Sequence, residues 1–426
     1  MDDSARPDRS GLRERFPGLA REVAGASAVF ADAPGGTQVP ESVISAMTDY
    51  LARSNANAGG AFATSEETDQ VIAGARRAGA DLLGCEPGEV VFGPNMTTLA
   101  FALSRSISRL LGPDDEVVVT VLDHDANVSP WVLAARDAGA TTRWVDVVEE
   151  DGTVDLESLG AVLGDRTRLV AFTMGSNALG TVTPAQRIVQ EVREEAPEAW
   201  VVADAVHLAQ HRAMDVRALD VDVAFCSAYK VFGPHLGLMY AKHDLLRDLV
   251  PYKVRPANDL PPDRWETGTA NHEGMAGFIA AVEYLAGIGQ RDGGPERAPG
   301  PRDRRAEVLA GMEAVRRHEA DLSRRFLEGL AEVPDVSLYG IAEVGRVDER
   351  TPTFAIRLGD QHPRETAEAL GRRGIFVWDG NYYALGIMER LELEEAGGAV
   401  RIGFCHYHSA ADVDRVLDAL RDVTAP

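Results

Sequence analysis

The sequence predicts an α/β fold, in which a large, mostly parallel sheet with helices on both faces is followed by a smaller α+β unit. Seven short apolar runs recur between Glu89 and Lys242, and helix-length segments separate most of them. The pattern changes after Gly289–Arg305, a stretch rich in Gly, Pro and charge that is typical of a linker or surface loop. These observations together predict two domains.

Each expected strand of the large sheet is a short apolar run bounded by polar or turn residues. The expected strands are Glu89–Gly93, Glu116–Val121, Thr141–Val147, Arg168–Met174, Ala199–Asp204, Asp222–Ser227 and Gly237–Lys242. Segments beginning at Thr98, Ser129 and Ala185 are expected to be helices between them. Because parallel strands need long crossover connections, this alternation favours a sheet buried between layers of helices.

The C-terminal part shows a different order of elements. A long amphipathic helix is expected at Ala306–Glu332. The later expected elements are strands at Val336–Gly340, Thr351–Leu358, Gly374–Trp378 and Ala399–Phe404, and helices at Pro363–Arg373 and Ala410–Val423. The predicted boundaries are an N-terminal segment at 1–30 that packs on the small domain, a large domain at 31–290, a linker at 291–305 and a small domain at 306–426.

Composition excludes several classes of partner. Asp and Glu number 67 against 43 Lys and Arg, and the net charge of −24 disfavours nucleic acid and anionic membranes as partners. The three cysteines include no C-x-x-C pair, which argues against a disulfide framework. The charged N-terminus lacks the apolar core of a secretory signal, and no apolar run approaches the ~20 residues of a membrane helix. We therefore expect a cytoplasmic protein.

Polar side chains follow four of the predicted strands, where open α/β sheets bind their ligands. Thr97 and Thr98 begin a helix after a Gly-Pro turn, which suits either a phosphate or an ordinary helix cap. His124, Asn177 and Asp204 each follow or close another strand. Taken singly, His124 also fits a solvated loop and Asn177 a turn. Asp204 ends an otherwise apolar run, so its carboxylate is expected to be partly buried and to need a partner.

Lys230 is the most informative residue, because it comes directly after the apolar run that ends at Ser227. Burial of an ammonium is costly, whereas a neutral amine at such a place can form a Schiff base with an aldehyde. Asn177, Asp204 and Lys230 are spaced by about one strand-helix-strand step each, so they are expected at the same sheet edge. A buried carboxylate can hold the ring nitrogen of pyridoxal phosphate protonated. The combination predicts a pyridoxal phosphate site.

Several motifs strengthen this prediction. They are Thr97–Thr98, HDAN at His124–Asn127, SNALGT at Ser176–Thr181, DAVH at Asp204–His207, SAYK at Ser227–Lys230, GTANHEG at Gly268–Gly274 and RIGFCHYHS at Arg401–Ser409. In these motifs the chain resembles the cysteine desulfurase-like branch of the class V aminotransferase family, which has the fold of fold-type I enzymes that depend on pyridoxal 5'-phosphate. The resemblance runs from roughly Val29 to Leu420. It implies a seven-stranded, mostly parallel sheet in the large domain.

The resemblance implies a role for each residue around the cofactor ring. Lys230 would form the Schiff base, Asp204 would pair with the pyridine nitrogen, and His124 would stack on the ring. Asn177 and His207 would lie near the phenolic oxygen. Lys230 and His124 are therefore candidate catalytic residues.

The resemblance also implies residues for the phosphate and the substrate. Thr97, Thr98 and Ser227 would bind the phosphate, joined by Thr269 from a neighbouring subunit. Arg401 would bind the α-carboxylate of the substrate, a task suited to a planar guanidinium. Because relatives complete their sites across a two-fold axis, a homodimer with shared active sites is expected.

The sequence departs from desulfurases where they carry a catalytic cysteine in a pattern like R-x-G-x-x-C. In this chain Gly380 keeps the glycine, while Trp378 replaces the arginine and Tyr383 the cysteine. A phenol cannot receive sulfane sulfur as a thiolate does. The chain's cysteines lie elsewhere, at Cys85 in a turn, Cys226 in a strand and Cys405 on the strand that contains Arg401. Desulfuration through the usual persulfide is therefore not expected.

Two further features of the sequence bear on the chemistry. Tyr229 precedes the lysine and His207 stands where Gln is common, as in lyase, kynureninase and epimerase relatives. Cys405, His406 and His408 are close enough in sequence to suggest zinc. Strand alternation would send Cys405 to the face opposite the histidines, and no fourth ligand is evident, so no metal is expected.

The leading hypothesis is a lyase acting on a small L-amino acid, such as cysteine or an S- or Se-substituted relative. Lys230 would remove the α-proton, and Tyr383, Tyr382 and Trp378 would shape the substrate pocket, with Tyr383 a further catalytic candidate. An epimerase, an aminotransferase or a kynureninase-like enzyme would use the same carbanion. A catalytically idle, cofactor-binding scaffold is the alternative of another class.

Overall fold

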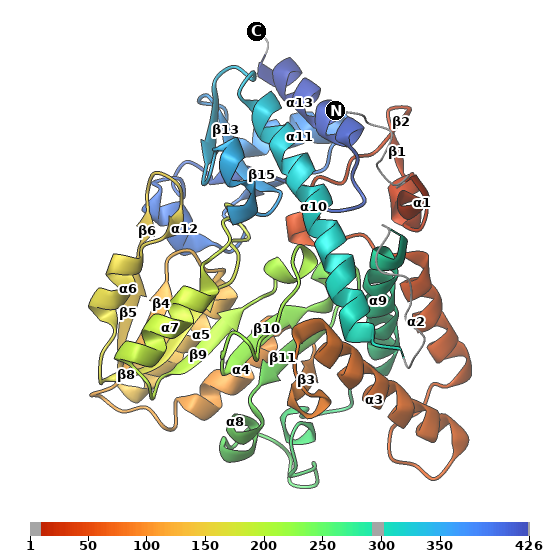
Figure 1. Ribbon diagram of the computed structural model, residues 1–426, viewed down its shortest axis with the longest axis vertical. Helices are drawn as coiled ribbons and strands as arrows, with labels where there is room; N and C mark the ends of the chain where they lie inside the picture. The colour runs from red at the N-terminus through yellow and green to blue at the C-terminus, as the bar shows by residue number, and fades with distance from the viewer. Residues whose placement is uncertain (1–9, 292–301, 425–426) are drawn as a thin grey trace.

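The computed structural model describes residues 10–291 and 302–424, which form a large mixed sheet, a small antiparallel sheet and their surrounding helices (Figure 1). Most of the predicted linker, residues 292–301, lies outside the described residues, as do residues 1–9 of the predicted N-terminal segment. The large sheet and the small sheet occupy different parts of the molecule, with the small sheet near the C-terminus in Figure 1. The domain boundaries drawn from the sequence stay a prediction.

The large sheet has seven strands, as predicted. In spatial order they are β3 (Val90–Gly93), β11 (Gly237–Ala241), β10 (Val223–Ser227), β9 (Trp200–Asp204), β8 (Thr167–Thr173), β4 (Glu116–Thr120) and β5 (Thr141–Val145). β11 runs antiparallel to both of its neighbours, and the pairs from β10 to β5 are parallel. The sheet is therefore mostly parallel, and the α/β fold class is confirmed.

Two apolar cores cover the two faces of this sheet, because alternate residues of each strand point to opposite sides. In β10, Ala224 and Cys226 belong to one core, and Val223 and Phe225 belong to the other. The first core is completed by α3 (Ala63–Leu83), α7 (Ala185–Glu195) and α9 (His272–Arg291). The second is completed by α4 (Met96–Ile107), α5 (Ser129–Ala138) and α8 (His243–Asp248). Burial on both faces explains why the strands read as continuous apolar runs.

Helix ends are set by local sequence signals. α4 begins at Met96, just before the start predicted at Thr97 or Thr98, because the side chain of Asn95 accepts a hydrogen bond from the backbone N–H of Thr98. α5 has Pro130 in its first turn and ends at Gly139, whose φ of 76° suits glycine. The helix starts at Met96 and Ser129 therefore fix where the loops after β3 and β4 end.

The small sheet has four antiparallel strands around a third core. Their order is β12 (Val336–Tyr339), β13 (Thr353–Leu358), β15 (Ala399–Gly403) and β14 (Trp378–Gly380). The strand predicted at Gly374–Trp378 is wrong: Ile375 makes only an isolated bridge to Val29, and the strand starts at Trp378. The chain here first pairs with the N-terminal segment, a partner that no local pattern reveals.

The long helix α10 (Arg304–Leu330) connects the two parts of the fold (Figure 1). Its first half places Val308 and Met312 in a core of the large sheet, and its second half places Phe326 and Leu330 in the core of the small sheet. α11 (Pro363–Arg372) and α13 (Ala410–Thr424) complete the small-sheet core. One rigid element therefore contributes to both cores.

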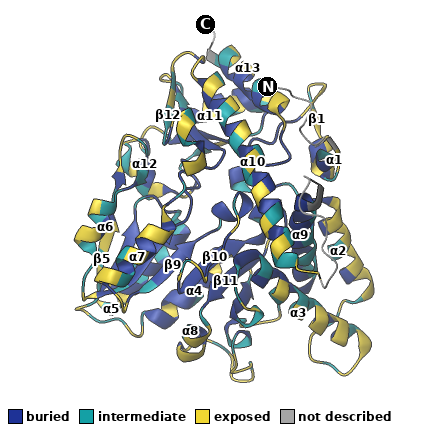
Figure 2. Cartoon of the chain, in the orientation of Figure 1, coloured by how far each residue is buried: buried dark blue, intermediate teal, exposed yellow. Residues whose placement is uncertain are grey.

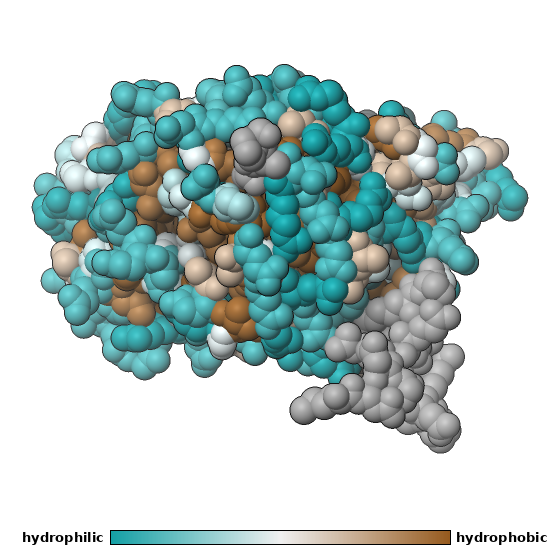
Figure 3. Space-filling model, turned by 90° about the horizontal axis from the view of Figure 1, so that it is seen from above, coloured by the Kyte–Doolittle hydropathy of each residue, from teal (hydrophilic) through white to brown (hydrophobic). Residues whose placement is uncertain are grey.

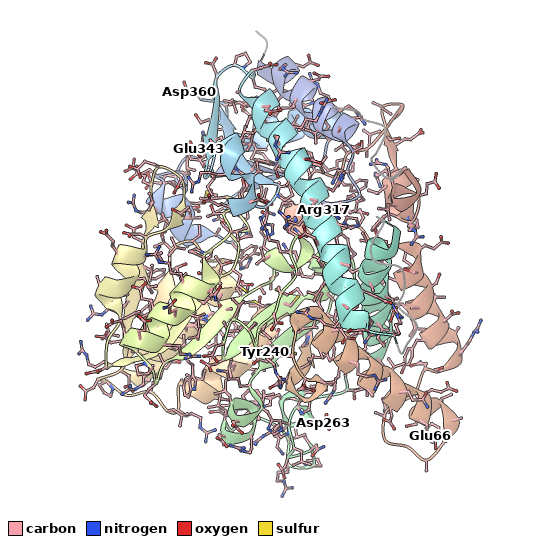
Figure 4. All side chains as sticks on the ribbon, in the orientation of Figure 1. Glu66, Tyr240, Asp263, Arg317, Glu343 and Asp360 are labelled. Carbon is pink, nitrogen blue, oxygen red and sulfur yellow. The ribbon has the colours of Figure 1, made fainter. Side chains whose placement is uncertain are left out.

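The surface is polar and the sheet interior is buried. Figure 2 shows buried residues concentrated in the sheets, and Figure 3 shows a largely hydrophilic face with scattered apolar patches. Tyr240, labelled in Figure 4, lies within the large sheet and is 1% exposed, whereas the labelled Glu66 and Asp360 are exposed. Within the described ranges, no helix is long and apolar enough to cross a membrane.

Candidate active site

A cavity lies at the carboxyl ends of five strands of the large sheet. Its lining comes from the segments after β3, β4, β8, β9 and β10, namely Asn95, Met96, Thr97, His124, Ala126, Thr173, Gly175, Asn177, Asp204, Val206, His207, Ser227, Tyr229 and Lys230. Parallel strands bring their carboxyl ends to one edge, so residues far apart in sequence meet there. The cavity collects seven of the residues singled out from the sequence: Thr97, His124, Asn177, Asp204, His207, Ser227 and Lys230.

Lys230 is a buried amine. β10 ends at Ser227, and a short 3-10 turn (Ala228–Lys230) carries the lysine to the cavity, where it is 7% exposed. Its Nζ donates a hydrogen bond to the carbonyl oxygen of Pro34. Burial lowers the pKa of Lys230 to about 7, helped by the positive charge of Arg401 and opposed by Asp204. A large share of the amine is therefore neutral near pH 7.

Asp204 lies one strand away and is also buried. It ends β9 in parallel register with Phe225 of β10, and its Oδ1 accepts a hydrogen bond of 2.8 Å from the backbone N–H of Val206. Burial raises the pKa of Asp204 to about 6, while that hydrogen bond and the charge of Lys230 lower it. No salt bridge neutralises Asp204 in the described part of the chain. The carboxylate thus suits a cationic partner inside the cavity.

A second buried carboxyl group, that of Asp123, lies outside the cavity lining and was missed from the sequence. Its oxygens accept hydrogen bonds from Thr120, from Asn127 at 2.7 Å and from the backbone N–H of Thr173 at 3.0 Å. Burial raises the pKa of Asp123 to about 8. Asp123 thereby ties the loop that carries His124 to the end of β8. Its place directly before His124, after an apolar strand, was the available signal.

His124 is held as a neutral imidazole. Its Nδ1 accepts a hydrogen bond of 3.0 Å from the backbone N–H of Ala126, which leaves the proton on Nε2. Burial lowers the pKa of His124 to about 3, with further effects from Lys230 and Arg401. The ring of Tyr383 is stacked on it, with centroids 5.4 Å apart and planes at 18°. A flat, uncharged ring is therefore presented at the cavity wall.

His207 is buried and lines the same cavity as Asp204. Its Nε2 lies 3.2 Å from the hydroxyl of Thr351 and 3.1 Å from that of Thr353. Its Nδ1 has no hydrogen-bond partner among the described residues. Burial, together with the nearby His211, lowers the pKa of His207 well below its usual range. One ring nitrogen is thus anchored and the other is left for a ligand.

Arg401 joins the small sheet to the cavity. It is 4% exposed, and its guanidinium donates a hydrogen bond of 2.9 Å to the backbone oxygen of Asn177 and lies 4.4 Å from the ring centre of Tyr382. Burial lowers the pKa of Arg401 to about 10. Within the described chain, its Nε and the Oδ1 of Asn177 have no hydrogen-bond partner. These atoms remain available to an anion or a polar ligand.

The start of α4 provides the polar end of the cavity. Thr97 and Ser227 line it, but Thr98 does not, because its hydroxyl donates a hydrogen bond of 2.9 Å to Asn95 Oδ1. A Cβ on Gly237 would lie 2.3 Å from the backbone of Asn95, so only glycine lets β11 approach the helix start this closely. Asn95 lines the cavity and was missed, since its capping role depends on where α4 begins.

Five residues predicted for the site lie outside the lining. One is Arg401, which donates a hydrogen bond to the lining residue Asn177. Thr269 is exposed in a separate open groove. Trp378, 53% exposed, pairs across β14 and β15 with Arg401. Tyr383 is 72% exposed and reaches the site only through its stack on His124. Thr98 caps the helix. A single chain therefore does not bring these side chains into the cavity.

Tyr229 and Thr173 also line the cavity, and their roles were not predicted. Thr173 closes β8 just as Asp204 closes β9, so the rule that identified Asp204 would have found it. Tyr229 is stacked on His235, with centroids 5.3 Å apart. Its signal was its position directly before the lysine.

The cysteines lie away from the cavity. Cys226 and Cys405 are buried and Cys85 is partly buried, and burial raises the pKa of Cys85 and of Cys226 to about 12. Cys405 was expected on a strand, but it lies beyond the strand because β15 ends at Gly403. The Nδ1 of His408 accepts a hydrogen bond from the backbone N–H of Cys405. The described residues contain no group of three or more side chains placed to hold a metal.

Known proteins share this architecture. The aminotransferase class-V family model matches residues 29–292 and 306–416. A probable cysteine desulfurase of Streptomyces coelicolor is 29% identical over 98% of this chain and 97% of its own length. The aminotransferase-like protein FGM3 of Gibberella zeae is 29% identical over 97% of each chain. The apo structure of a cysteine desulfurase from Thermococcus onnurineus superimposes with a TM-score of 0.83 at 23% identity, over 98% of each chain.

Proposed function

This chain belongs to the class V aminotransferase family of enzymes that depend on pyridoxal phosphate, and we propose that it binds pyridoxal 5'-phosphate in the cavity described above. We further propose that it is a C–S or C–Se lyase, similar to cysteine desulfurases but without their persulfide cysteine, acting on a small L-amino acid. The observation that carries the proposal is the pair of Lys230 and Asp204, an amine of lowered pKa and a carboxyl group that are both buried in one cavity.

The residues present fit the cofactor. Lys230 Nζ would attach it, and Asp204 would pair with its ring nitrogen. His207 Nδ1, which has no partner among the described residues, would donate a hydrogen bond to its phenolic oxygen, and Asn177 would lie beside that oxygen. Thr97 and Ser227 would hold its phosphate near the start of α4, where the helix dipole favours an anion. The unpartnered buried atoms support this fit, because a native interior rarely leaves them unsatisfied.

The bound cofactor would supply an electron sink for charge that develops at the substrate's α-carbon. The chain's own groups perform the proton transfer. Lys230 Nζ, neutral in large part near pH 7, would accept the α-proton. Asp204 would keep its negative charge opposite the cofactor's ring nitrogen. His124, which is neutral and is fixed by Ala126, would lie against the cofactor ring without adding a competing positive charge.

Arg401 would bind the α-carboxylate of the substrate. Its guanidinium is already oriented by the backbone oxygen of Asn177 and the ring of Tyr382, so little side-chain entropy is lost on binding. Its unpartnered Nε supports the assignment. A carboxylate held there would place a small amino acid between the two sheets.

The absence of a persulfide step is supported by the cysteine positions. The sequence contains Cys85, Cys226 and Cys405, and none lines the cavity. Burial disfavours their thiolates, which are the nucleophilic forms. Tyr383 occupies the loop position where desulfurases carry their cysteine. The product would therefore leave directly as sulfide, selenide or a thiol.

The test uses purified protein reconstituted with pyridoxal phosphate and a panel of amino acids that includes cysteine, selenocysteine and S-substituted cysteines. We expect the visible spectrum to change on addition of substrate, and sulfide, selenide or thiol to be released together with a keto acid and ammonia, the products of β-elimination. Loss of α-deuterium without release of a leaving group would favour an epimerase or aminotransferase. A spectrum that no amino acid alters would favour an idle scaffold.

We also propose a homodimer, because Thr269, expected at a neighbouring site, is exposed and lies outside this chain's cavity. Sedimentation analysis of the loaded enzyme should give twice the mass of one chain. A Thr269→Ala variant should bind the cofactor more weakly although it leaves its own chain's cavity intact. A monomer with full cofactor affinity would contradict this assembly.

A further inference from the structure

The loop between β14 and α12 (Leu385–Arg390) brings an aromatic ring against the cavity wall. Tyr382 and Tyr383 have φ values of 53° and 59°, so two consecutive residues other than glycine adopt the left-handed conformation. Such residues persist only where the surrounding structure holds them. Contacts with neighbouring segments must therefore hold this loop in place.

Two hydrogen bonds hold the loop's backbone to segments that line or adjoin the cavity, and a third lies within the loop. The side chain of Asn177 donates a hydrogen bond of 3.0 Å to the backbone oxygen of Tyr382. The backbone N–H of Asp125 donates one of 2.6 Å to the backbone oxygen of Tyr383. The backbone N–H of Tyr383 donates in turn to the side chain of Asn381 at 3.0 Å. The loop is thus fixed from the segment that carries His124 and from the segment after β8.

The other end of the loop is anchored in the small sheet. The hydroxyl of Tyr382 donates a hydrogen bond to the backbone oxygen of Ala399, and the side chain of Asn381 donates to both carboxylate oxygens of Glu394, at 3.0 and 3.2 Å. Tyr382 is 9% exposed. With both ends held, the position of Tyr383 follows from the fold rather than from contacts of its own side chain.

The result is a stack that covers one face of His124. Tyr383 does not line the cavity whereas His124 does, so the stacked face of the imidazole is the one turned away from the cavity. The backbone N–H of Ala126 fixes the ring's edge through Nδ1. The ring of His124 is held at its edge by a hydrogen bond and at its outer face by an aromatic plane.

We propose that Tyr383 is a positioning residue that fixes the ring of His124 across the cavity through this stack, and that the plane of its ring, not its hydroxyl, performs the task. The inference rests on the proposed function for its purpose, since an imidazole fixed in this way presents its inner face to the cofactor. Tyr383 need not touch the substrate. Its 72% exposure is explained because only one face of its ring is used.

The first test needs no cofactor. The apoprotein is labelled with 13C-histidine, and the imidazole signal of His124 is assigned by its loss in His124→Gln. The ring current of Tyr383 should displace the chemical shift of this signal from that of a histidine with no aromatic ring beside it. Tyr383→Phe should keep this displacement and Tyr383→Ala should abolish it. Tyr252→Ala removes another tyrosine, 65% exposed and outside the cavity lining, and should leave the signal unchanged. An unchanged signal in Tyr383→Ala would overturn the inference.

The second test measures cofactor binding by fluorescence titration. Tyr383→Ala should weaken affinity about two- to tenfold, as expected for loss of one aromatic stack, and Tyr383→Phe should match the wild type. In the His124→Gln background, Tyr383→Ala should have no further effect. If Phe and Ala weaken binding equally, the hydroxyl is responsible and the inference is wrong. If wild type binds no cofactor, the proposed function fails, whereas the histidine signal still decides whether the stack exists.

Discussion

Replacing Asp204 by Asn should stabilise the apoprotein while impairing cofactor binding. The carboxyl is fully enclosed, and burial raises its pKa to about 6 from 3.8. A carboxyl whose pKa is higher in the folded state than in the unfolded state favours folding while it is protonated. That contribution is present below about pH 4 and is lost as the pH rises through 6. Asn cannot ionise, and its side-chain oxygen can still accept the N–H of Val206.

The size of the effect follows from the two pKa values of Asp204. The pKa of Asp204 is 3.8 in the unfolded chain and about 6 in the folded chain. The free energy of unfolding of the wild type should therefore fall by about 1.4 kcal/mol between about pH 5 and pH 7, and by about 3 kcal/mol over the whole titration. The variant should not show this loss. Unsatisfied amide hydrogens of the new Asn would offset part of the gain, so we expect the variant apoprotein to be about 1–3 kcal/mol more stable at pH 7.

The assay is urea unfolding of both apoproteins, followed by tryptophan fluorescence, at pH 5 and pH 7. The same variant should bind pyridoxal phosphate about 10- to 100-fold more weakly, because a hydrogen bond to a charged group contributes about 1.5–3 kcal/mol. Glu89→Gln is a suitable control, because Glu89 is a buried carboxylate paired with Arg217, remote from the cavity lining. If Asp204→Asn showed the wild-type dependence of stability on pH, or bound the cofactor equally well, Asp204 would not be the unpaired charge described here.

Three further predictions concern the amine and the guanidinium of the site. Lys230→Ala should abolish the absorbance band of covalently attached cofactor, while Lys242→Ala, a change at a surface ion pair, should not. Because the pKa of Lys230 is about 7, the rate of cofactor attachment to the apoprotein should rise about tenfold from pH 6 to pH 8 and then level off. A rate that continues to rise through pH 10 would contradict that pKa. Arg401→Lys should raise KM for the amino acid about 10- to 100-fold with a smaller change in kcat. The control is Arg357→Lys on β13, where the arginine donates hydrogen bonds to the backbone of Ala396 and Gly398, and this variant should leave KM unchanged.

Sequence reasoning located the large sheet well, because strands buried on both faces leave continuous apolar runs. The polar residue at each strand end then predicted which side chains would meet, and Asp204 and Lys230 do line one cavity. This success depends on parallel topology, which brings strand ends far apart in sequence to one edge. It did not require knowledge of loop conformation.

The conformations of the loops could not be predicted from the sequence. Thr98 was predicted to bind the phosphate, but its hydroxyl donates a hydrogen bond to the side chain of Asn95. This bond depends on the residue at which α4 begins. The strand predicted at Gly374–Trp378 is displaced because the chain pairs with Val29. Tyr383 was expected to shape the substrate pocket, yet its ring is stacked on His124, a contact that depends on two left-handed residues. Each of these outcomes depends on long-range backbone contacts.

The position of β3 has a consequence for how the chain can fold during synthesis. β3 is an edge strand that pairs only with β11, although β4, β8, β9 and β10 are all translated between them. β3 therefore remains unpaired until β11 has left the ribosome. A nascent chain halted before that point would expose an apolar edge, so chaperone capture should be strongest for such intermediates and should cease once β11 emerges.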